Sequence, residues 1–75
     1  MNYTVDEKEL RKAMISAGYN TIIDLSNASD VDRNTIGGIL NGKVRPTSTV
    51  IEKLARALSL SGADIGLIFF KNKLS

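Results

Sequence analysis

The 75-residue chain has no cysteine, no histidine and no tryptophan, and it has only one proline. Without cysteine there are no disulfides to stabilise a small fold, and without cysteine and histidine the usual ligands of a structural zinc site are missing. The same absences remove the thiol nucleophile and the commonest general base of enzymes. We therefore expect a protein that is not an enzyme and that holds no metal and no cofactor.

Long apolar runs and aromatic side chains are also scarce. The longest apolar run, residues 67–70, is far too short to span a bilayer, and the N-terminus has no basic segment leading into an apolar one. Two tyrosines and two phenylalanines are few for a protein that stacks single-stranded nucleic acid on aromatic rings. We expect a soluble, cytoplasmic protein, with one domain over residues 1–75.

The charges that are present are distributed unevenly. Residues 1–30 carry three basic and five acidic side chains, whereas residues 31–75 carry seven basic and three acidic ones. No acidic residue lies between Arg33 and Ile51, so Arg33, Lys43 and Arg45 have no acidic neighbour in this part of the sequence. Such a segment can bind phosphate, and a merely solvated basic loop is the equal alternative.

Helical periodicity and capping residues indicate an all-α fold. Side chains suited to cap a helix recur along the chain: Thr4, in capping-box spacing with Glu7, then Asn20 or Thr21, Asp32, Thr47 or Thr49, and Ser61. The apolar periodicity after each cap predicts five helices, at about residues 5–17, 21–28, 33–41, 49–58 and 62–70, with a frayed tail at 71–75. In the second helix Ile22, Leu25 and Ala28 fit the buried face, whereas Ile23 lies off it.

The stretch from Ile22 to Arg45 contains two of these helices with almost no room between them. In the second, Ile36, Ile39 and Leu40 recur at helical spacing and should face the core. The outward face then carries mostly small or polar groups: Arg33, Asn34, Gly37, Gly38 and Asn41. A short helix with such a face, followed by basic residues, suits a groove of nucleic acid better than a catalytic pocket.

The adjacent glycines of this helix need an explanation, because each costs about 1 kcal/mol of helix stability relative to alanine. One explanation is functional: without side chains at Gly37 and Gly38, the backbone can approach a DNA groove or another protein closely. The other is structural, since glycine also permits close packing of a neighbouring helix or a kink.

The C-terminal helix has more apolar residues than one narrow buried stripe can hold. Those that remain exposed would form an interface, or Phe69 or Phe70 folds back over the first helix and completes the core. The candidate protein interface comprises Gly37, Gly38, Leu67, Phe69 and Phe70.

The order and spacing of these residues resemble the Cro and phage-repressor (XRE-type) helix-turn-helix family over roughly residues 10–68. Leucine and a small residue occur in the second helix, valine in the turn, Thr-Ile in the third helix, and Asn-Gly-Lys before a proline. The matching residues are Leu25-Ser26, Val31, Thr35-Ile36, Ile39, Asn41-Gly42-Lys43, Pro46, Leu54 and Leu58.

The resemblance implies a five-helix, lambda-repressor-like domain that places its third helix in the major groove of double-stranded DNA. It implies contacts with base edges by Arg33, Asn34 and Gly38, and with phosphates by Thr21, Asn41, Lys43 and Arg45. Such a protein is a small phage- or prophage-type transcriptional regulator, acting as a homodimer.

A second function belongs to a different class. Phage switches that resemble this family include antirepressors, which bind a cognate repressor protein rather than DNA. The paired glycines, Leu40 and the apolar C-terminal helix would suit such a protein contact.

Overall fold

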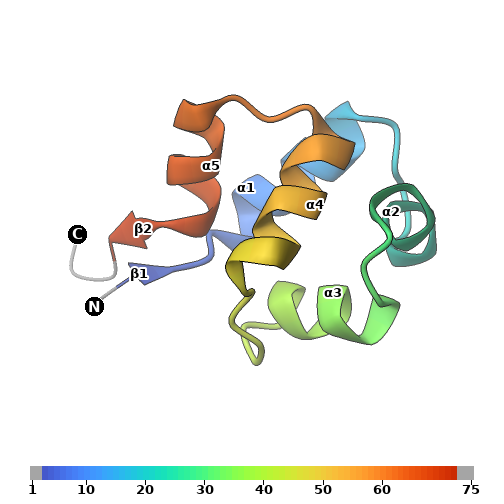
Figure 1. Cartoon of the computed structure of the whole chain (residues 1–75), viewed down its shortest axis with the longest axis horizontal. Helices are drawn as coiled ribbons and strands as arrows, with labels where there is room; N and C mark the ends of the chain where they lie inside the picture. The colour runs from blue at the N-terminus through green and yellow to red at the C-terminus, as the bar shows by residue number, and fades with distance from the viewer. Residues whose placement is uncertain (1–2, 73–75) are drawn as a thin grey trace.

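The computed structural model describes residues 3–72, which form five α-helices and one pair of short antiparallel strands (Figure 1). The elements are β1 (Tyr3–Thr4), α1 (Glu7–Ser16), α2 (Ile22–Ser29), α3 (Arg33–Leu40), α4 (Ser48–Leu58), α5 (Gly62–Phe69) and β2 (Lys71–Asn72). The predicted all-α class and its five helices are confirmed.

Side-chain caps determine where all five helices begin. The hydroxyl of Thr21 accepts from the backbone N–H of Asp24 at the start of α2, and Thr47, not Thr49, caps α4. Ser61 and Asp64 bond reciprocally to each other's backbone N–H groups and form a capping box at α5. The Asp32 cap of α3 is part of the candidate site described below. These polar side chains satisfy backbone N–H groups that a helix leaves without partners in its first turn.

The start of the first helix differs from the prediction. Asp6, not Thr4, is the N-cap of α1, because its carboxylate accepts from the backbone N–H of Glu9 at 3.2 Å. Thr4 is extended instead and pairs with Lys71 in the ladder between β1 and β2. Thr4 lies two positions before Asp6, too far from the first turn of α1 to cap it.

The two ends of the described chain are joined. The prediction of a frayed tail is wrong for residues 71 and 72, which pair with β1, while residues 73–75 lie outside the described part. The Asp6 carboxylate lies 3.3 Å from the ammonium of Lys71, and the Asp6 backbone N–H donates to the carbonyl of Ile68 at 2.6 Å. The rings of Tyr3 and Phe70 meet edge to face with centroids 6.0 Å apart.

One apolar core joins the five helices. The buried residues of the core are Leu10, Met14, Leu25, Val31, Ile36, Ile39, Leu40, Leu54, Leu58, Ile68 and Phe69. The prediction that Ile36, Ile39 and Leu40 face inward is therefore confirmed. Leu40 is a core residue and contributes nothing to the outward face of α3.

The core face of α2 was predicted only in part. Ala28 is exposed, whereas Ser29 is buried one helical turn after Leu25. The hydroxyl of Ser29 donates to the carbonyl of Leu25 at 2.7 Å and accepts from the backbone N–H of Val31 at 3.3 Å. A small polar side chain can lie in a core when the nearby backbone satisfies its hydrogen bonds in this way.

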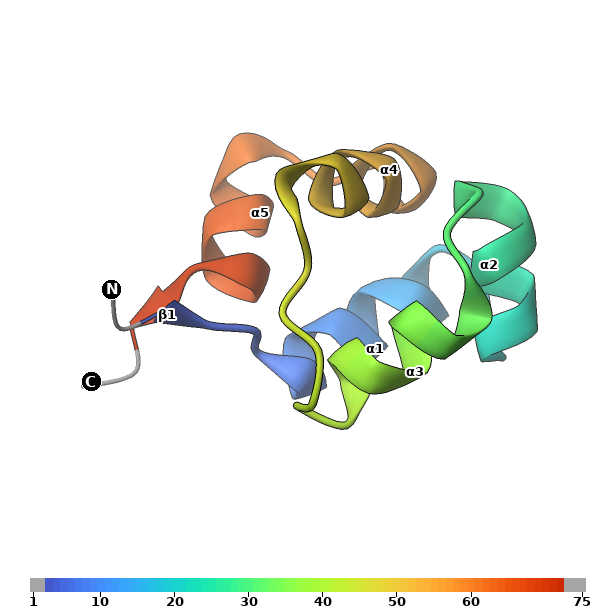
Figure 2. The same ribbon diagram turned by 60° about the horizontal axis from the view of Figure 1, so that its bottom comes forward.

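The helices place α3 at one edge of the molecule. In both Figure 1 and Figure 2, α3 lies along the lower edge, α2 at the right, and α5 with the paired chain ends at the left. One face of α3 is therefore free of neighbouring elements. No helix among residues 3–72 combines the length and the apolar character needed to cross a membrane.

The Asp6 contacts predict an acid-sensitive part of the stability. The hydrogen bond from the Glu9 backbone N–H, and next the Lys71 ammonium, lower the pKa of Asp6 below its ordinary value of 3.8. A lowered folded-state pKa contributes stability that is present above the unfolded pKa and is lost as the pH falls through the folded value. We expect Asp6→Ala to lower the free energy of unfolding at pH 7 by ~0.5–2 kcal/mol, the usual cost of losing a cap.

Asp6→Asn separates the contribution of the helix cap from that of the ion pair with Lys71. Asparagine caps a helix as well as aspartate does, but it cannot attract Lys71 electrostatically. Urea unfolding followed by circular dichroism from pH 5 to pH 2 should show a shallower loss of stability for Asp6→Asn than for the wild type. Glu52→Gln, on the exposed side of α4, serves as the control and should keep the wild-type slope. Identical slopes for Asp6→Asn and the wild type would contradict the assignment.

Candidate functional site

The first turn of α3 presents two polar side chains to solvent. The Asp32 carboxylate accepts from the backbone N–H of Asn34 at 2.9 Å and from that of Thr35 at 3.3 Å. Arg33 and Asn34 occupy the first two positions of the helix, and both are exposed. Within residues 3–72 neither side chain has a hydrogen bond or an ion pair, so both are free to contact a ligand.

The turn between α2 and α3 fixes the direction of that first turn. Asp30 ends α2 in the left-handed conformation, with φ 59° and ψ 33°, which short polar side chains tolerate better than most. The hydroxyl of Ser26 donates to the carbonyl of Val31 at 2.6 Å, and the Val31 side chain is buried beneath the turn. Asp30 is also linked to α4 by an ion pair with Lys53, at 3.9 Å.

Gly38 is required by contacts within the chain. A Cβ atom at this position would lie 2.4 Å from Cγ2 and 3.0 Å from Cβ of Val44, closer than any ordinary contact. The carbonyl of Gly38 accepts from the backbone N–H groups of Lys43 and Val44, at 2.8 and 3.1 Å. The loop after α3 therefore folds back onto the helix at Gly38, which has no side chain.

Gly37 has a different environment. A Cβ atom there would lie 3.9 Å from the end of the Ile22 side chain, which is ordinary van der Waals distance. The structural explanation named a neighbouring helix, whereas the close contact at Gly38 is with Val44 of the loop after α3; no contact of the described residues demands glycine at position 37.

A shallow hollow lies on the outward side of α3, with a volume of about 420 Å³. We call it the outer hollow; its lining residues are Ile22, Ile23, Arg33, Asn34, Gly37, Gly38 and Asn41. It brings together four of the residues predicted to contact DNA: Arg33, Asn34, Gly38 and Asn41. Bare backbone at the two glycines forms its middle.

The other predicted contact residues surround α3 without lining the hollow. Thr21 caps α2 next to Ile22, and its hydroxyl hydrogen remains available because the oxygen serves as the acceptor for Asp24. Lys43 and Arg45 follow Gly42, whose φ of 75° reverses the chain after α3. Both basic side chains are exposed, and neither belongs to the ion pairs found within residues 3–72.

Two residues of the site were not predicted. The Glu7 carboxylate lies near the basic loop, 3.4 Å from where a Cβ of Gly42 would stand, and shares a recess with Arg45. The loop is therefore less free of negative charge than the local sequence indicates, and no sequence signal predicts a contact 35 positions apart. Ile23 lines the outer hollow with 53% of its surface exposed. The sequence signal for an exposed Ile23 was its position off the buried face of α2.

The predicted interface on α5 needs one correction. Phe69 is 4% exposed and lies in the core, so it offers no surface to a partner. This agrees with the alternative prediction, in which Phe69 or Phe70 completes the core. Leu67 and Phe70 remain exposed, at 66% and 47%. The helical period explains the difference, since Phe69 follows the buried Ile68 on the side of α5 that faces α1.

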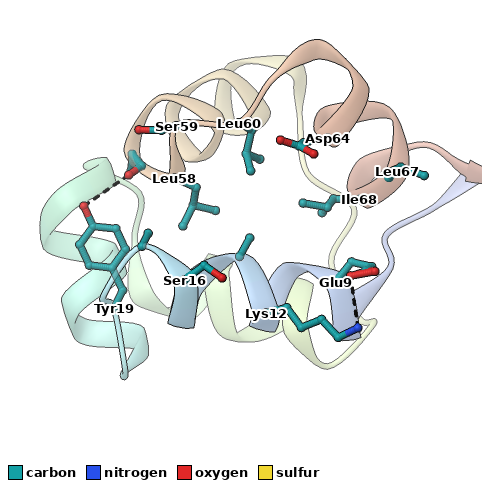
Figure 3. Close-up of a pocket in the computed structure, with 13 residues that line it drawn as sticks. Glu9, Lys12, Ser16, Tyr19, Leu58, Ser59, Leu60, Asp64, Leu67 and Ile68 are labelled. Atoms are coloured by element: carbon teal, nitrogen blue, oxygen red, sulfur yellow. Dashed lines mark hydrogen bonds and ion pairs between the residues drawn. The ribbon is translucent and has the colours of Figure 1, made fainter.

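A groove between α1 and the α4–α5 segment has a volume of about 630 Å³ (Figure 3). Its base is apolar, with Leu58, Leu60 and Ile68 directed into it. An ion pair between Lys12 and Glu9, at 3.7 Å, lies on one rim, and the Tyr19 hydroxyl donates to the carbonyl of Ala57 at one end. This groove contains none of the residues on the outward face of α3.

Comparison with known protein families gives a match. A family model described as helix-turn-helix matches residues 8–65, which include α2, the turn, α3 and the basic loop. No curated protein and no solved structure matches the chain.

The two glycines of α3 should respond in opposite directions to alanine. Gly37→Ala should raise the free energy of unfolding by ~0.4–1 kcal/mol, because alanine fits there and restricts the unfolded chain. Gly38→Ala should lower it by ~1–3 kcal/mol, since the new methyl group forces Val44 and its loop away from the helix. Urea unfolding of the two variants measures both effects.

Val44→Ala provides the matching control, because it removes Cγ2, the atom that the new Cβ would approach most closely, and keeps Cβ. The double variant Gly38→Ala/Val44→Ala should recover part of the loss relative to Val44→Ala alone, since the Cβ–Cβ approach of 3.0 Å remains. Equal effects of Gly37→Ala and Gly38→Ala would show that the loop contact does not constrain position 38.

Proposed function

Because this chain belongs to the helix-turn-helix family of the Cro and repressor (XRE) type, whose members are DNA-binding regulators, we propose that it binds operator DNA with α3 in the major groove. The supporting observation is the pair of exposed, unpartnered side chains at the capped start of α3, Arg33 and Asn34. The fork of arginine can bond the O6 and N7 atoms of guanine, and the amide of asparagine can bond the N6 and N7 atoms of adenine. Gly38 has no side chain, so any contact that it makes with base edges is through its backbone.

The residues around α3 suit the phosphate backbone. The Thr21 hydroxyl and the Asn41 amide can donate to phosphate oxygens, and Lys43 and Arg45 supply unpaired positive charge beyond the C-terminal end of α3. Contacts of this kind fix the register of a protein on the duplex, and they carry most of the salt dependence of its affinity.

We extend the proposal to a homodimer that binds two half-sites as a small phage- or prophage-type repressor, blocking polymerase by occupying the operator. Leu67 and Phe70 are exposed apolar residues in and just after α5, at the end of the molecule away from α2 (Figure 1). An interface there leaves α3 of both copies open to DNA. Half-sites of a symmetric dimer are spaced by about 34–36 Å, one turn of the double helix.

The alternative is an antirepressor that binds a cognate repressor protein. Two of the residues that suggested it, Leu40 and Phe69, are buried in the core. Gly38 is explained by its contact with Val44, which removes a further reason for a smooth protein-binding face. The exposed polar pair on α3 therefore favours DNA as the partner.

The test of the proposed function is a titration of the full chain with duplex DNA from its own genomic neighbourhood at several salt concentrations. Arg33→Ala should cost ~1–3 kcal/mol on the preferred site and relax the preference at one base pair. Lys43→Ala should weaken binding to all sequences and reduce the slope of log K against log salt by about 1.

Arg56→Ala is the matched control, because Arg56 is exposed in the last turn of α4 and does not line the outer hollow. It should bind as the wild type does. Absence of any complex at low salt, together with co-purification of a neighbouring repressor, would replace the proposal with the antirepressor alternative.

Glu7 should weaken DNA binding through its charge near the basic loop. Glu7→Gln should tighten binding at low salt by about two- to fivefold, because unit charges a few ångströms apart interact by ~1 kcal/mol or less in water. The gain should shrink as salt is added, since exposed charges are screened. Glu7→Asp, which keeps the charge, should stay near the wild-type affinity, and an equal gain in both variants would rule out an electrostatic cause.

A further inference from the structure

Ile23 is an exposed apolar side chain on the candidate DNA-binding face. It lies in the first turn of α2, off the buried face that Leu25 and Ser29 form. More than half of its surface is open to solvent, and it lines the outer hollow together with Arg33 and Asn34. Ile23 is not a member of the core cluster.

The outer hollow offers an apolar group room for contact. The end of the Ile22 side chain lies 3.9 Å from where a Cβ of Gly37 would stand, and Ile22 and Ile23 both line the hollow. Gly37 has no side chain to cover these two isoleucines, whereas Val44 occupies the space beside Gly38. A small group entering beside Arg33 and Asn34 would therefore meet aliphatic carbon on the α2 side.

The base edges of the major groove contain one apolar substituent, the C5-methyl group of thymine, and apolar side chains recognise it by direct contact. Phosphate oxygens and the polar base edges gain nothing from an isoleucine side chain, because it has no hydrogen-bond donor. The charge around the hollow also suits DNA, since Arg33 lines it and the unpaired Lys43 and Arg45 follow α3.

We propose that Ile23 contacts the C5-methyl group of a thymine when α3 lies in the major groove, so that α2 contributes to sequence specificity. This inference rests on the proposed function and adds to it a residue outside the recognition helix. It accounts for an exposed isoleucine in a hollow that is also lined by two glycines, Gly37 and Gly38. Bases are then read by polar groups from α3 and by an apolar group from α2.

The experiment uses the full chain and begins by selecting bound sites from a randomised duplex library. Each thymine of the selected site is then replaced by deoxyuridine, which removes the methyl group and leaves every hydrogen-bonding edge unchanged. The wild type should lose about fourfold in Kd at one thymine of each half-site, the effect expected for burial of one methyl group. Ile23→Ala should bind the thymine and uracil forms of that site equally well.

Ile15→Ala is the matched control, because Ile15 is the other strongly exposed isoleucine, at 66%, and does not line the outer hollow. It should keep the fourfold preference for thymine. If every deoxyuridine site binds like its thymine counterpart, or if Ile23→Ala retains the preference, the assignment of Ile23 is overturned while DNA binding stands. If no sequence is enriched, the proposed function fails and this inference fails with it.

Discussion

The contact between Gly38 and the loop after α3 determines the form of the surface proposed to bind DNA. Two backbone N–H groups of the loop donate to one carbonyl of the helix, and Val44 occupies the space where a side chain of residue 38 would stand. This contact holds the segment of Lys43 and Arg45 close to the end of α3. The position of the basic loop relative to Arg33 and Asn34 therefore depends on a residue that has no side chain of its own.

The same contact limits how the proposed surface could read DNA. A helix whose middle positions are glycines has few side chains left for base contacts, and the ones that remain lie in its first turn. The surface that results is polar at Arg33 and Asn34, bare at the glycines, and apolar where Ile23 borders it. Specificity must then come from a few strong contacts, supported by phosphate contacts that orient the helix.

The paired chain ends support the site from the opposite side of the loop. The ladder between β1 and β2 places Tyr3 and Phe70 in the same recess as Arg45 and Pro46, and α1 begins immediately after β1 with Glu7 against Gly42. The start of α1 is fixed by Asp6, which caps the helix and pairs with Lys71. Through these contacts the Glu7 carboxylate of the acidic N-terminal part lies near the loop, which the uneven distribution of charge in the sequence did not indicate.

The sequence by itself determined the fold class, the five helices, the inward residues of α3 and the exposure of Arg33 and Asn34. These features depend on short-range physics, namely the helical period of apolar residues and caps within a few positions of each other. Only the tertiary structure decided that Phe69 and Ser29 are buried, that residues 71 and 72 pair with the N-terminus, that Glu7 lies at the basic loop and that Gly38 accommodates Val44. Each of these depends on distances between segments whose relative placement is set by the packing of the whole core, and local sequence does not contain that information.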